Sequence, residues 1–271
     1  MPNGAANNGA DVAASGGTTP PGTSSEKQAA RWVQQMFSDI APKYDLLNHL
    51  LSFNIDRRWR KVLLKSLAGV LARPDARILD LCCGTGDVLL DLQAAAKSRV
   101  LGADFCHPML VTAQRKAMEQ GFRAPLMEGD AMELPLADES LDAISVAFGL
   151  RNLVNYGAAL KEFRRVLKPG GTLAILEFSH PPGVFMRTAY GFYSAVVLPA
   201  VGSLISGSRA AYAYLPESVS KFPKAEELRE MMVAAGFAEA RFELLTGGIA
   251  ALHLGVTAVE GLAGSRDVSI P

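Results

Sequence analysis

The residues best suited to chemistry lie between Ile78 and Asp87, in the stretch ILDLCCGTGD. It combines two adjacent cysteines, a Gly-x-Gly and flanking carboxylates, so metal, redox and nucleotide chemistry are all open. Adjacent cysteines lack the Cys-x-x-Cys geometry of a redox pair, and the scattered histidines offer no zinc-ligand spacing. We therefore predict no metal site, and we expect one sulfur of Cys82 and Cys83 to pack in the core and the other to line the loop.

The glycine loop favours a small organic ligand. Gly84 and Gly86 let the backbone turn tightly and approach a ligand closely. The dinucleotide fingerprint requires a third glycine, where this chain has Leu89. A pyrophosphate also favours a helix N-terminus without carboxylates, whereas Asp87 stands there. Together with Asp80, that carboxylate better suits a cationic or hydroxyl-rich ligand.

Two further carboxylates follow the next expected strands. Asp104 holds the usual position of an acidic residue that binds ribose hydroxyls, and Asp130 lies in EGDAMELP, next to where an adenine would lie. S-adenosylmethionine is a nucleoside that carries an amino acid and a positive sulfonium, so it meets these requirements. We expect it to be the cofactor.

The elements that must position these residues alternate between β-rich runs and amphipathic helices. The runs are ARILDL, SRVLGAD, APLMEGD, LDAISVAF and TLAILEFS, and the helices span 88–97, 108–120 and 156–167. This alternation predicts an α/β fold with a doubly wound, mostly parallel sheet, whose ligands lie beyond the carboxyl ends of the strands. A last helix, KAEELREMMVAAGF, precedes ARFELLT and GIAALHLGVTA, which predict an antiparallel terminal hairpin.

Composition shifts along the chain suggest its organisation. We expect a disordered tail over 1–26, a helical cap over 27–72, the sheet domain over 73–260 with a substrate-covering insertion at 182–222, and a tail over 261–271. The first part lacks the basic start and apolar core of a signal peptide, and three cysteines fit a reducing, cytoplasmic compartment. The uncharged stretch from Thr188 to Ser208 is interrupted by glycines and a proline, so we expect it to be buried or pocket-lining rather than transmembrane.

Overall charge excludes one class of partner. Lys plus Arg equals Asp plus Glu at 27 each, so the chain has no general attraction to nucleic acid. The local run DRRWRK could contact anionic lipid at the inner face of the membrane, or it could be a solvated helix face.

Several stretches resemble the ubiquinone and menaquinone biosynthesis C-methyltransferases. The likeness runs from about Ala29 to Val256. It is carried by MFSDIAPKYDLLNHLLSF, DLCCGTGD, GDAMELPLADESLDAISVAFGLRN, RVLKPGGTLAILEFS, YLPESVSKFP and GGIAALHLG. The resemblance implies a seven-stranded, Rossmann-like class I methyltransferase sheet. It also implies methyl transfer from S-adenosylmethionine to a ring carbon of a polyprenylated hydroquinone. We expect demethylmenaquinol as the acceptor, but the sequence does not decide between a naphthoquinol and a methoxybenzoquinol.

The resemblance also implies site residues. Cofactor contacts would fall on Thr85, Asp104, Asp130, Ala131 and Ala147, in addition to the loop residues already named. Ala147 stands where some relatives have serine, so its contact would come from the backbone.

Carbon methylation requires an electron-rich ring, which a hydroquinol anion supplies and an oxidised quinone does not. Arg151 and Asn152 follow the fourth strand, where an arginine could hold the developing oxyanion and an amide could orient a ring oxygen. Alternatively, Arg151 only pairs with a surface carboxylate. Tyr44, Asp45 and His49 form a second candidate set, in which the last two share a helix face, and a purely structural role is equally open.

Three other functions remain open. The chain could methylate another small-molecule or lipid acceptor, or it could be a non-catalytic cofactor-binding subunit of a quinone-synthesis complex. The retained FGLRN argues against the second, and Leu89 disfavours a dinucleotide oxidoreductase. The apolar stretch from Phe185 to Ile205 and the N-terminal helices would cover a polyprenyl tail, and a homodimer is left open.

Overall fold

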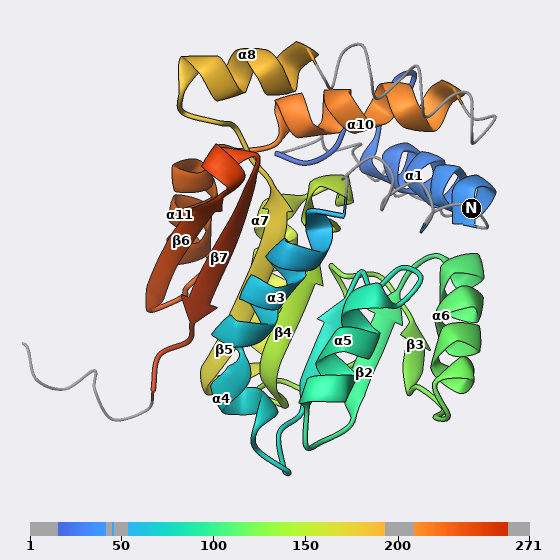
Figure 1. Ribbon diagram of the computed structural model, residues 1–271, viewed down its shortest axis with the longest axis vertical. Helices are drawn as coiled ribbons and strands as arrows, with labels where there is room; N and C mark the ends of the chain where they lie inside the picture. The colour runs from blue at the N-terminus through green and yellow to red at the C-terminus, as the bar shows by residue number, and fades with distance from the viewer. Residues whose placement is uncertain (1–15, 42–44, 46–53, 193–208, 260–271) are drawn as a thin grey trace, which may run out of the picture.

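A computed structural model describes residues 16–41, 45, 54–192 and 209–259 (Figure 1). Its sheet has seven strands in the order β3-β2-β1-β4-β5-β7-β6. The strands are β1 (Ile78–Leu81), β2 (Val100–Asp104), β3 (Leu126–Glu128), β4 (Leu141–Ala147), β5 (Leu167–Phe178), β6 (Glu239–Leu245) and β7 (Ala250–Val256). The first five are parallel, and β7 runs antiparallel to both β5 and β6. The predicted α/β sheet with an antiparallel terminal hairpin is confirmed.

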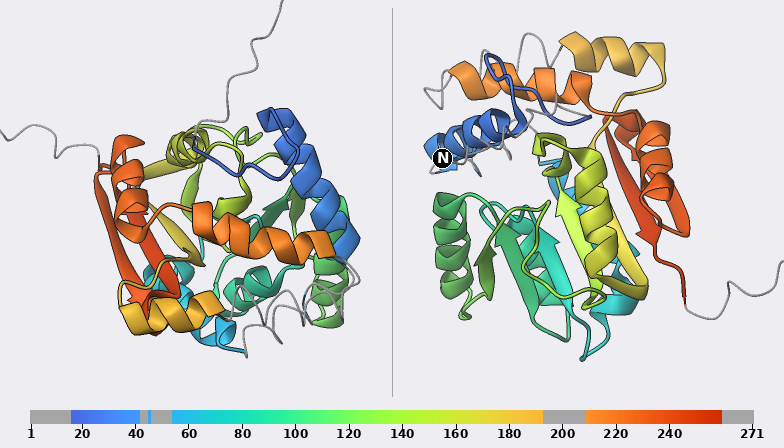
Figure 2. Two further views of the ribbon diagram at one scale, coloured as in Figure 1. Left: turned by 90° about the horizontal axis from the view of Figure 1, so that it is seen from above. Right: turned by 180° about the vertical axis from the view of Figure 1, so that it is seen from behind.

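Helices cover both faces of this sheet (Figures 1 and 2). On one face lie α3 (Asp56–Ser66), α4 (Ala68–Leu71) and α5 (Asp87–Ala95), and on the other lie α7 (Tyr156–Val166) and α11 (Ala225–Ala234). Next to β2 and β3 lies α6 (His107–Glu119). Beyond the carboxyl ends of the strands lie α1 (Glu26–Ile40), α8 (Val184–Phe192) and α10 (Arg209–Lys221). Two short 3-10 turns, η2 (Leu150–Asn152) and η4 (Thr246–Gly248), follow β4 and β6.

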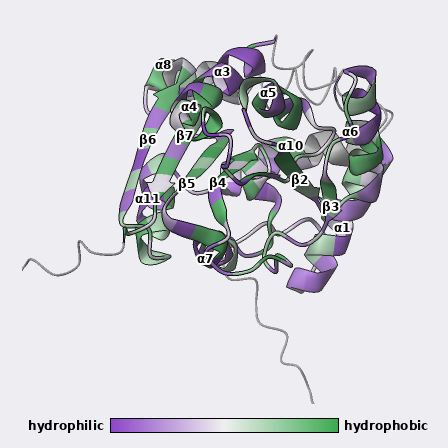
Figure 3. Cartoon of the chain, turned by 90° about the horizontal axis from the view of Figure 1, so that it is seen from below, coloured by the Kyte–Doolittle hydropathy of each residue, from purple (hydrophilic) through white to green (hydrophobic). Residues whose placement is uncertain are grey.

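The pattern of apolar residues explains these layers. The central strands β1 and β4 are almost entirely buried, and the flanking helices contain both hydrophobic and hydrophilic residues (Figure 3). Leu63 of α3 and Leu89 of α5 are buried in one core, and Leu160 and Phe163 of α7 are buried in the other. Asn155 caps α7 by accepting from the amide of Ala158, so the side chain fixes where the helix begins. The two cores hold the sheet rigid, so its carboxyl edge is a stable platform.

A third apolar cluster fastens the cap to that edge. It joins Val33 and Met36 of α1 to Met109 of α6 and Tyr214 of α10. Figure 2, left, shows α1 and α10 crossing above the strand ends.

The segment ahead of α1 differs from the sequence expectation. The part of the predicted disordered tail that the structure describes, residues 16–25, is packed against the protein. Thr18 is only 3% exposed, and its amide donates to the carbonyl of Leu153 at 2.8 Å. The amide of Tyr156 donates to the carbonyl of Gly16 at 3.3 Å. A composition rich in Gly, Thr and Pro did not reveal these contacts, because they join the backbone to distant residues.

Two expectations fall partly or wholly outside the described residues. They are the helix expected in PKYDLLNHLLSF, of which only Asp45 is described, and most of the uncharged stretch from Thr188 to Ser208. Among the residues that are described, no helix is both long enough and apolar enough to cross a membrane.

Candidate active site

A pocket opens at the carboxyl ends of β1, β2 and β4, beneath α1. It is lined by Ala30, Phe37, Leu81, Cys82, Gly84, Asp104, Phe105, Met109, Gly129, Asp130, Ala131, Met132, Ala147, Phe148, Gly149, Asn152, Leu153 and Val154. The structure therefore brings together six of the residues singled out in the sequence, namely Gly84, Asp104, Asp130, Ala131, Ala147 and Asn152. The rest of the lining is mostly apolar, which suits a ligand with a flat ring and a few polar groups.

Asp104 supplies the buried negative charge of this pocket. It ends β2 and is only 7% exposed. Its carboxylate accepts from the amides of Gly84 at 2.8 Å and Cys106 at 2.9 Å. Burial raises the pKa of this carboxyl, although the amide donors act in the opposite direction. The backbone thus holds the carboxylate in one orientation at the base of the glycine loop.

The loop after β3 forms the neighbouring wall. Asp130 is exposed, and its carboxylate accepts from the amide of Met132 at 2.9 Å, which fixes the turn. Ala131 is buried between them. Phe105 and Met109 add apolar surface on the side of α6. This wall has the apolar and polar groups that a base edge requires.

The ends of β1 and β4 approach each other very closely. Cys82 and Phe148 have φ angles of 55° and 57°, a left-handed conformation that is costly for residues other than glycine. At Gly149 a Cβ would lie 2.3 Å from the Cβ of Cys82, so only glycine fits in this part of AFGLRN. Cys82 lines the pocket and Cys83 is buried in the core, as the sequence predicted for the two sulfurs.

Asp80 lies outside the pocket lining and is 1% exposed. One carboxylate oxygen accepts from the hydroxyl of Ser145 at 2.6 Å, and the other has no hydrogen-bond partner within the described part of the chain. Burial raises the pKa of Asp80 to about 7, against the effect of the Ser145 hydroxyl, and the negative charge of Asp104 raises it further. This carboxyl can therefore be neutral or charged near physiological pH.

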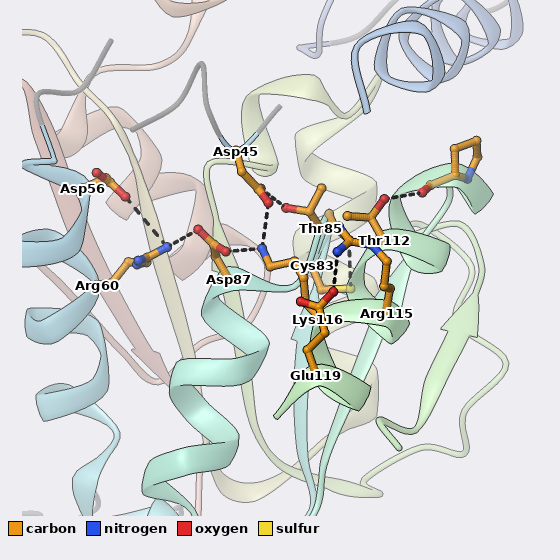
Figure 4. Close-up of polar contacts among 12 residues, drawn as sticks. Asp45, Asp56, Arg60, Cys83, Thr85, Asp87, Thr112, Arg115, Lys116 and Glu119 are labelled. Atoms are coloured by element: carbon orange, nitrogen blue, oxygen red, sulfur yellow. Dashed lines mark hydrogen bonds and ion pairs between the residues drawn. The ribbon is translucent and has the colours of Figure 1, made fainter. Parts of the chain in front are cut away.

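The outer side of the glycine loop is held by a chain of charges, which we call the ion network: Asp45, Thr85, Asp87, Lys116 and Arg60 (Figure 4). The Thr85 hydroxyl donates to Asp45, and the Lys116 ammonium contacts both Asp45, at 2.9 Å, and Asp87. Arg60 donates to Asp87 at 2.7 Å. Burial acts to raise the pKa of Asp87, but Lys116 and Arg60 outweigh it and lower the pKa overall.

This network separates two of the predicted site residues from the pocket. The Thr85 side chain is 2% exposed with its hydroxyl on Asp45, so only its backbone is left for a cofactor contact. Asp45 reaches the glycine loop, as its place in the candidate set requires, but its carboxylate is taken up by Thr85 and Lys116. Tyr44 and His49 lie outside the described residues.

Arg151 is held by a buried carboxylate, not by the surface carboxylate considered above. Its guanidinium lies 2.9 Å from Glu177, and the two side chains are 7% and 1% exposed. The same nitrogen donates to the carbonyl of Phe148, and the guanidinium stacks 5.3 Å from the ring centre of Phe178. In the part of the chain that the structure describes, Arg151 is not one of the residues that line the pocket. Sequence reasoning missed Glu177, although a lone carboxylate within TLAILEFS was a usable signal.

Asn152 is the polar side chain that η2 presents to the pocket. Its amide nitrogen donates to the carbonyl of Phe148 at 3.3 Å, and its oxygen accepts from the hydroxyl of Tyr214 at 3.2 Å. The adjacent residues of FGLRN therefore have separate environments, with Arg151 buried and Asn152 at the pocket wall.

Known proteins are similar in sequence to most of this chain. Residues 23–257 match the ubiE/COQ5 methyltransferase family. A demethylmenaquinone methyltransferase of Thermus thermophilus is 51% identical over 221 residues, which cover 81% of this chain and 99% of that protein. A ubiquinone/menaquinone biosynthesis C-methyltransferase of Syntrophotalea carbinolica is 47% identical over 227 residues, which cover 83% and 94%.

Solved structures share the fold at much lower identity. A [4+2]-cyclase, SpnF, has a TM-score of 0.63 and 19% identity, with 90% of this chain and 99% of that chain covered. A SAM-dependent methyltransferase from Aquifex aeolicus has a TM-score of 0.54 and 21% identity, with 73% and 89% covered. A cyclase and a methyltransferase share this fold, so the fold alone does not determine the chemistry.

Proposed function

The chain belongs to the ubiE/COQ5 methyltransferase family and is an S-adenosylmethionine-dependent methyltransferase, and we propose that it methylates a ring carbon of demethylmenaquinol. The observation that carries this acceptor is the 51% identity to a demethylmenaquinone methyltransferase across 99% of that protein. The pocket supports it, because an apolar lining with one polar amide suits a flat, oxygen-bearing ring.

The pocket residues fit the cofactor. Asp104 would accept from the ribose hydroxyls, and the wall formed by Asp130 and Ala131 would receive the adenine. Gly84 and the backbones of Thr85 and Ala147 would contact the rest of the cofactor, its methionine part. These assignments place carboxylates and backbone groups around a ligand that carries hydroxyls and a net positive sulfonium, which is the complementarity that buried acidic groups require.

Two further residues would act on the cofactor indirectly. Asp80 lies beneath the glycine loop and would add negative charge when ionised. Gly86, with φ 87°, precedes the first turn of α5 and turns the loop toward the pocket. When bound, S-adenosylmethionine supplies an electrophilic methyl group.

Asn152 would hold the acceptor ring. The ring carbon is nucleophilic when a neighbouring oxygen bears negative charge, and an N–H donor stabilises that oxygen. Arg151 precedes Asn152 in the chain, and because its charge is paired with Glu177 it would hold η2 in place rather than stabilise the ring oxygen directly. Correct placement of two reactants accounts for much of the rate enhancement in such transfers.

The elements beyond the strand ends would cover the polyprenyl tail. They are α8 and α10 of the predicted insertion over 182–222, together with α1, whose Phe37 lines the pocket. A long apolar tail also favours work at a membrane surface. Arg57, Arg58, Lys61 and Lys65 are exposed on α3 and would contact anionic headgroups on the cytoplasmic side, whereas a homodimer stays a prediction.

The test is methylation of a short-chain demethylmenaquinone with labelled S-adenosylmethionine, with and without dithionite. We expect label in the ring only after reduction, because a sulfonium methyl requires an electron-rich carbon.

Asn152→Ala should lower turnover by about a hundredfold while cofactor affinity, measured by calorimetry, stays unchanged. Equal labelling of the oxidised ring would contradict the chemistry. Cofactor binding without turnover on any quinol would favour the non-catalytic subunit instead.

A further inference from the structure

The segment ahead of the family match contributes to the site. The match begins at residue 23, yet Thr18 is buried and its hydroxyl lies 2.7 Å from the hydroxyl of Tyr214 on α10. Tyr214 is itself 4% exposed and packs against the ring of Trp32 at 5.1 Å. The contact joins residues that are 196 positions apart in the chain.

Gly17 explains how the segment reaches this place. A Cβ at Gly17 would lie 1.9 Å from the carbonyl oxygen of Val154, so only glycine lets the two backbones come so close. The next residue then donates its amide to Leu153 at 2.8 Å. Because Leu153 directly follows Asn152, the segment is anchored beside the pocket amide.

The hydrogen bonds from this segment have a defined direction. The Phe148 carbonyl, 3.3 Å from the Asn152 side chain, can only accept, so the amide nitrogen must face it. The amide oxygen then faces Tyr214, which must donate to it at 3.2 Å. Since the single proton of Tyr214 is used there, its oxygen accepts from the Thr18 hydroxyl.

We propose that Thr18 and Tyr214 are positioning residues that fix Asn152 as a hydrogen-bond donor toward the acceptor ring. This inference rests on the proposed function of Asn152. With the amide oxygen held by Tyr214, the second hydrogen of the nitrogen is the one left for the pocket. The group that Asn152 meets on the ring must therefore be an acceptor, as a phenolate oxygen is. The N-terminal segment of this chain becomes part of its catalytic arrangement.

The experiment compares Thr18→Val with Thr19→Val, both nearly isosteric, in the full-length protein. Thr19 is exposed and contacts Lys221 only through weak hydrogen bonds of 3.3 and 3.4 Å, so it is the matched control. We expect Tyr214→Phe, which loses both hydrogen bonds of its hydroxyl, to lower kcat about tenfold, and Thr18→Val, which loses one, to lower it about fivefold, with the KM for S-adenosylmethionine unchanged. Thr19→Val should keep wild-type turnover.

The double variant separates positioning from general support. In an Asn152→Ala background, Thr18→Val should lower kcat by less than twofold, because the group that it orients is gone. A full fivefold loss in that background would overturn the proposal, as would wild-type kcat in Thr18→Val alone.

A second readout does not depend on the acceptor. In protein labelled with ¹⁵N-asparagine, the side-chain amide signal of Asn152 should shift in Thr18→Val and stay in place in Thr19→Val. An unmoved Asn152 signal in Thr18→Val would overturn the proposed positioning of Asn152 by Thr18 and Tyr214, even if methylation proceeds. A shifted Asn152 signal in a protein that methylates no quinol would support this positioning role and contradict the proposed function.

Discussion

The two sides of the glycine loop hold charge in opposite ways. On the outer side, the ion network sets each carboxylate against lysine or arginine, and its charged side chains keep 11–33% exposure. On the sheet side, Asp80 and Asp104 are buried, and the donors that reach them from the described residues are neutral, a hydroxyl or amides. The first arrangement neutralises itself and fastens elements together. In the second arrangement, no lysine or arginine among the described residues is hydrogen-bonded to the two carboxylates, so we expect their charged forms to favour a cationic ligand.

The largest loss of stability should come from breaking the buried ion pair between Arg151 and Glu177. In Glu177→Gln the Arg151 guanidinium loses its ion pair with Glu177 while both side chains stay buried, so we expect unfolding to become easier by about 3 kcal/mol. Urea denaturation measures this change. Glu226→Gln, at an exposed pair with Arg229, is the control and should leave stability nearly unchanged, because solvent screens that pair. Equal effects at the two sites would remove the distinction between buried and outer charges.

Asp80 should make stability depend on pH. The unfolded chain releases this proton near the ordinary pKa of 3.8, and the folded protein releases it near 7. Between these values the unfolded chain binds fewer protons, so wild-type stability falls as the pH rises, and the loss is complete above about 7. Asp80→Asn removes this loss and should be more stable by about 3–4 kcal/mol at about pH 8, with no advantage below about pH 4. Urea denaturation across that range checks it, and a pH-independent difference would count against a buried acid.

Asp104 should matter more for the cofactor than for the fold. Asp104→Ala removes an acceptor for the ribose hydroxyls and should weaken S-adenosylmethionine binding by about 1.5–3 kcal/mol. Isothermal calorimetry measures the loss. Asp138→Ala, on an exposed loop, is the control and should bind normally. Unchanged affinity in Asp104→Ala would move the cofactor away from the end of β2.

The smallest effect should come from the outer side. Lys116→Met breaks two ion pairs of the network, but the side chains are partly solvated, and we expect about 1 kcal/mol of lost stability that shrinks at high salt. Thermal unfolding of the variant and the wild type, at low and at high salt, measures the loss of stability and its dependence on salt. If Lys116→Met lost as much stability as Glu177→Gln, the ion network would contribute to stability as strongly as a buried ion pair does, which would contradict this prediction.

The sequence predicted most of the fold because the relevant signals are local. Apolar runs such as LDAISVAF became strands, and the single break at Gly247 marked the terminal hairpin. It also placed Asp104 and Asp130 at the pocket, because strand ends in a parallel sheet share one edge.

Contacts between distant residues could not be predicted in this way. No local pattern pairs Arg151 with Glu177, and none turns the Thr85 hydroxyl toward Asp45. The buried contact of Thr18 with Tyr214 was hidden for the same reason, since a segment rich in small polar residues has the composition of a flexible tail.

The position of β7 has a consequence for how the chain matures on the ribosome. Strand β7 is synthesised after both β5 and β6, and it inserts between them. Until residue 256 has left the exit tunnel, β5 therefore presents a bare row of amide and carbonyl groups, the kind of edge to which other nascent chains can add. A ribosome stalled before that point would display this unpaired edge, so we expect chaperone binding to the nascent chain to persist until β7 has emerged.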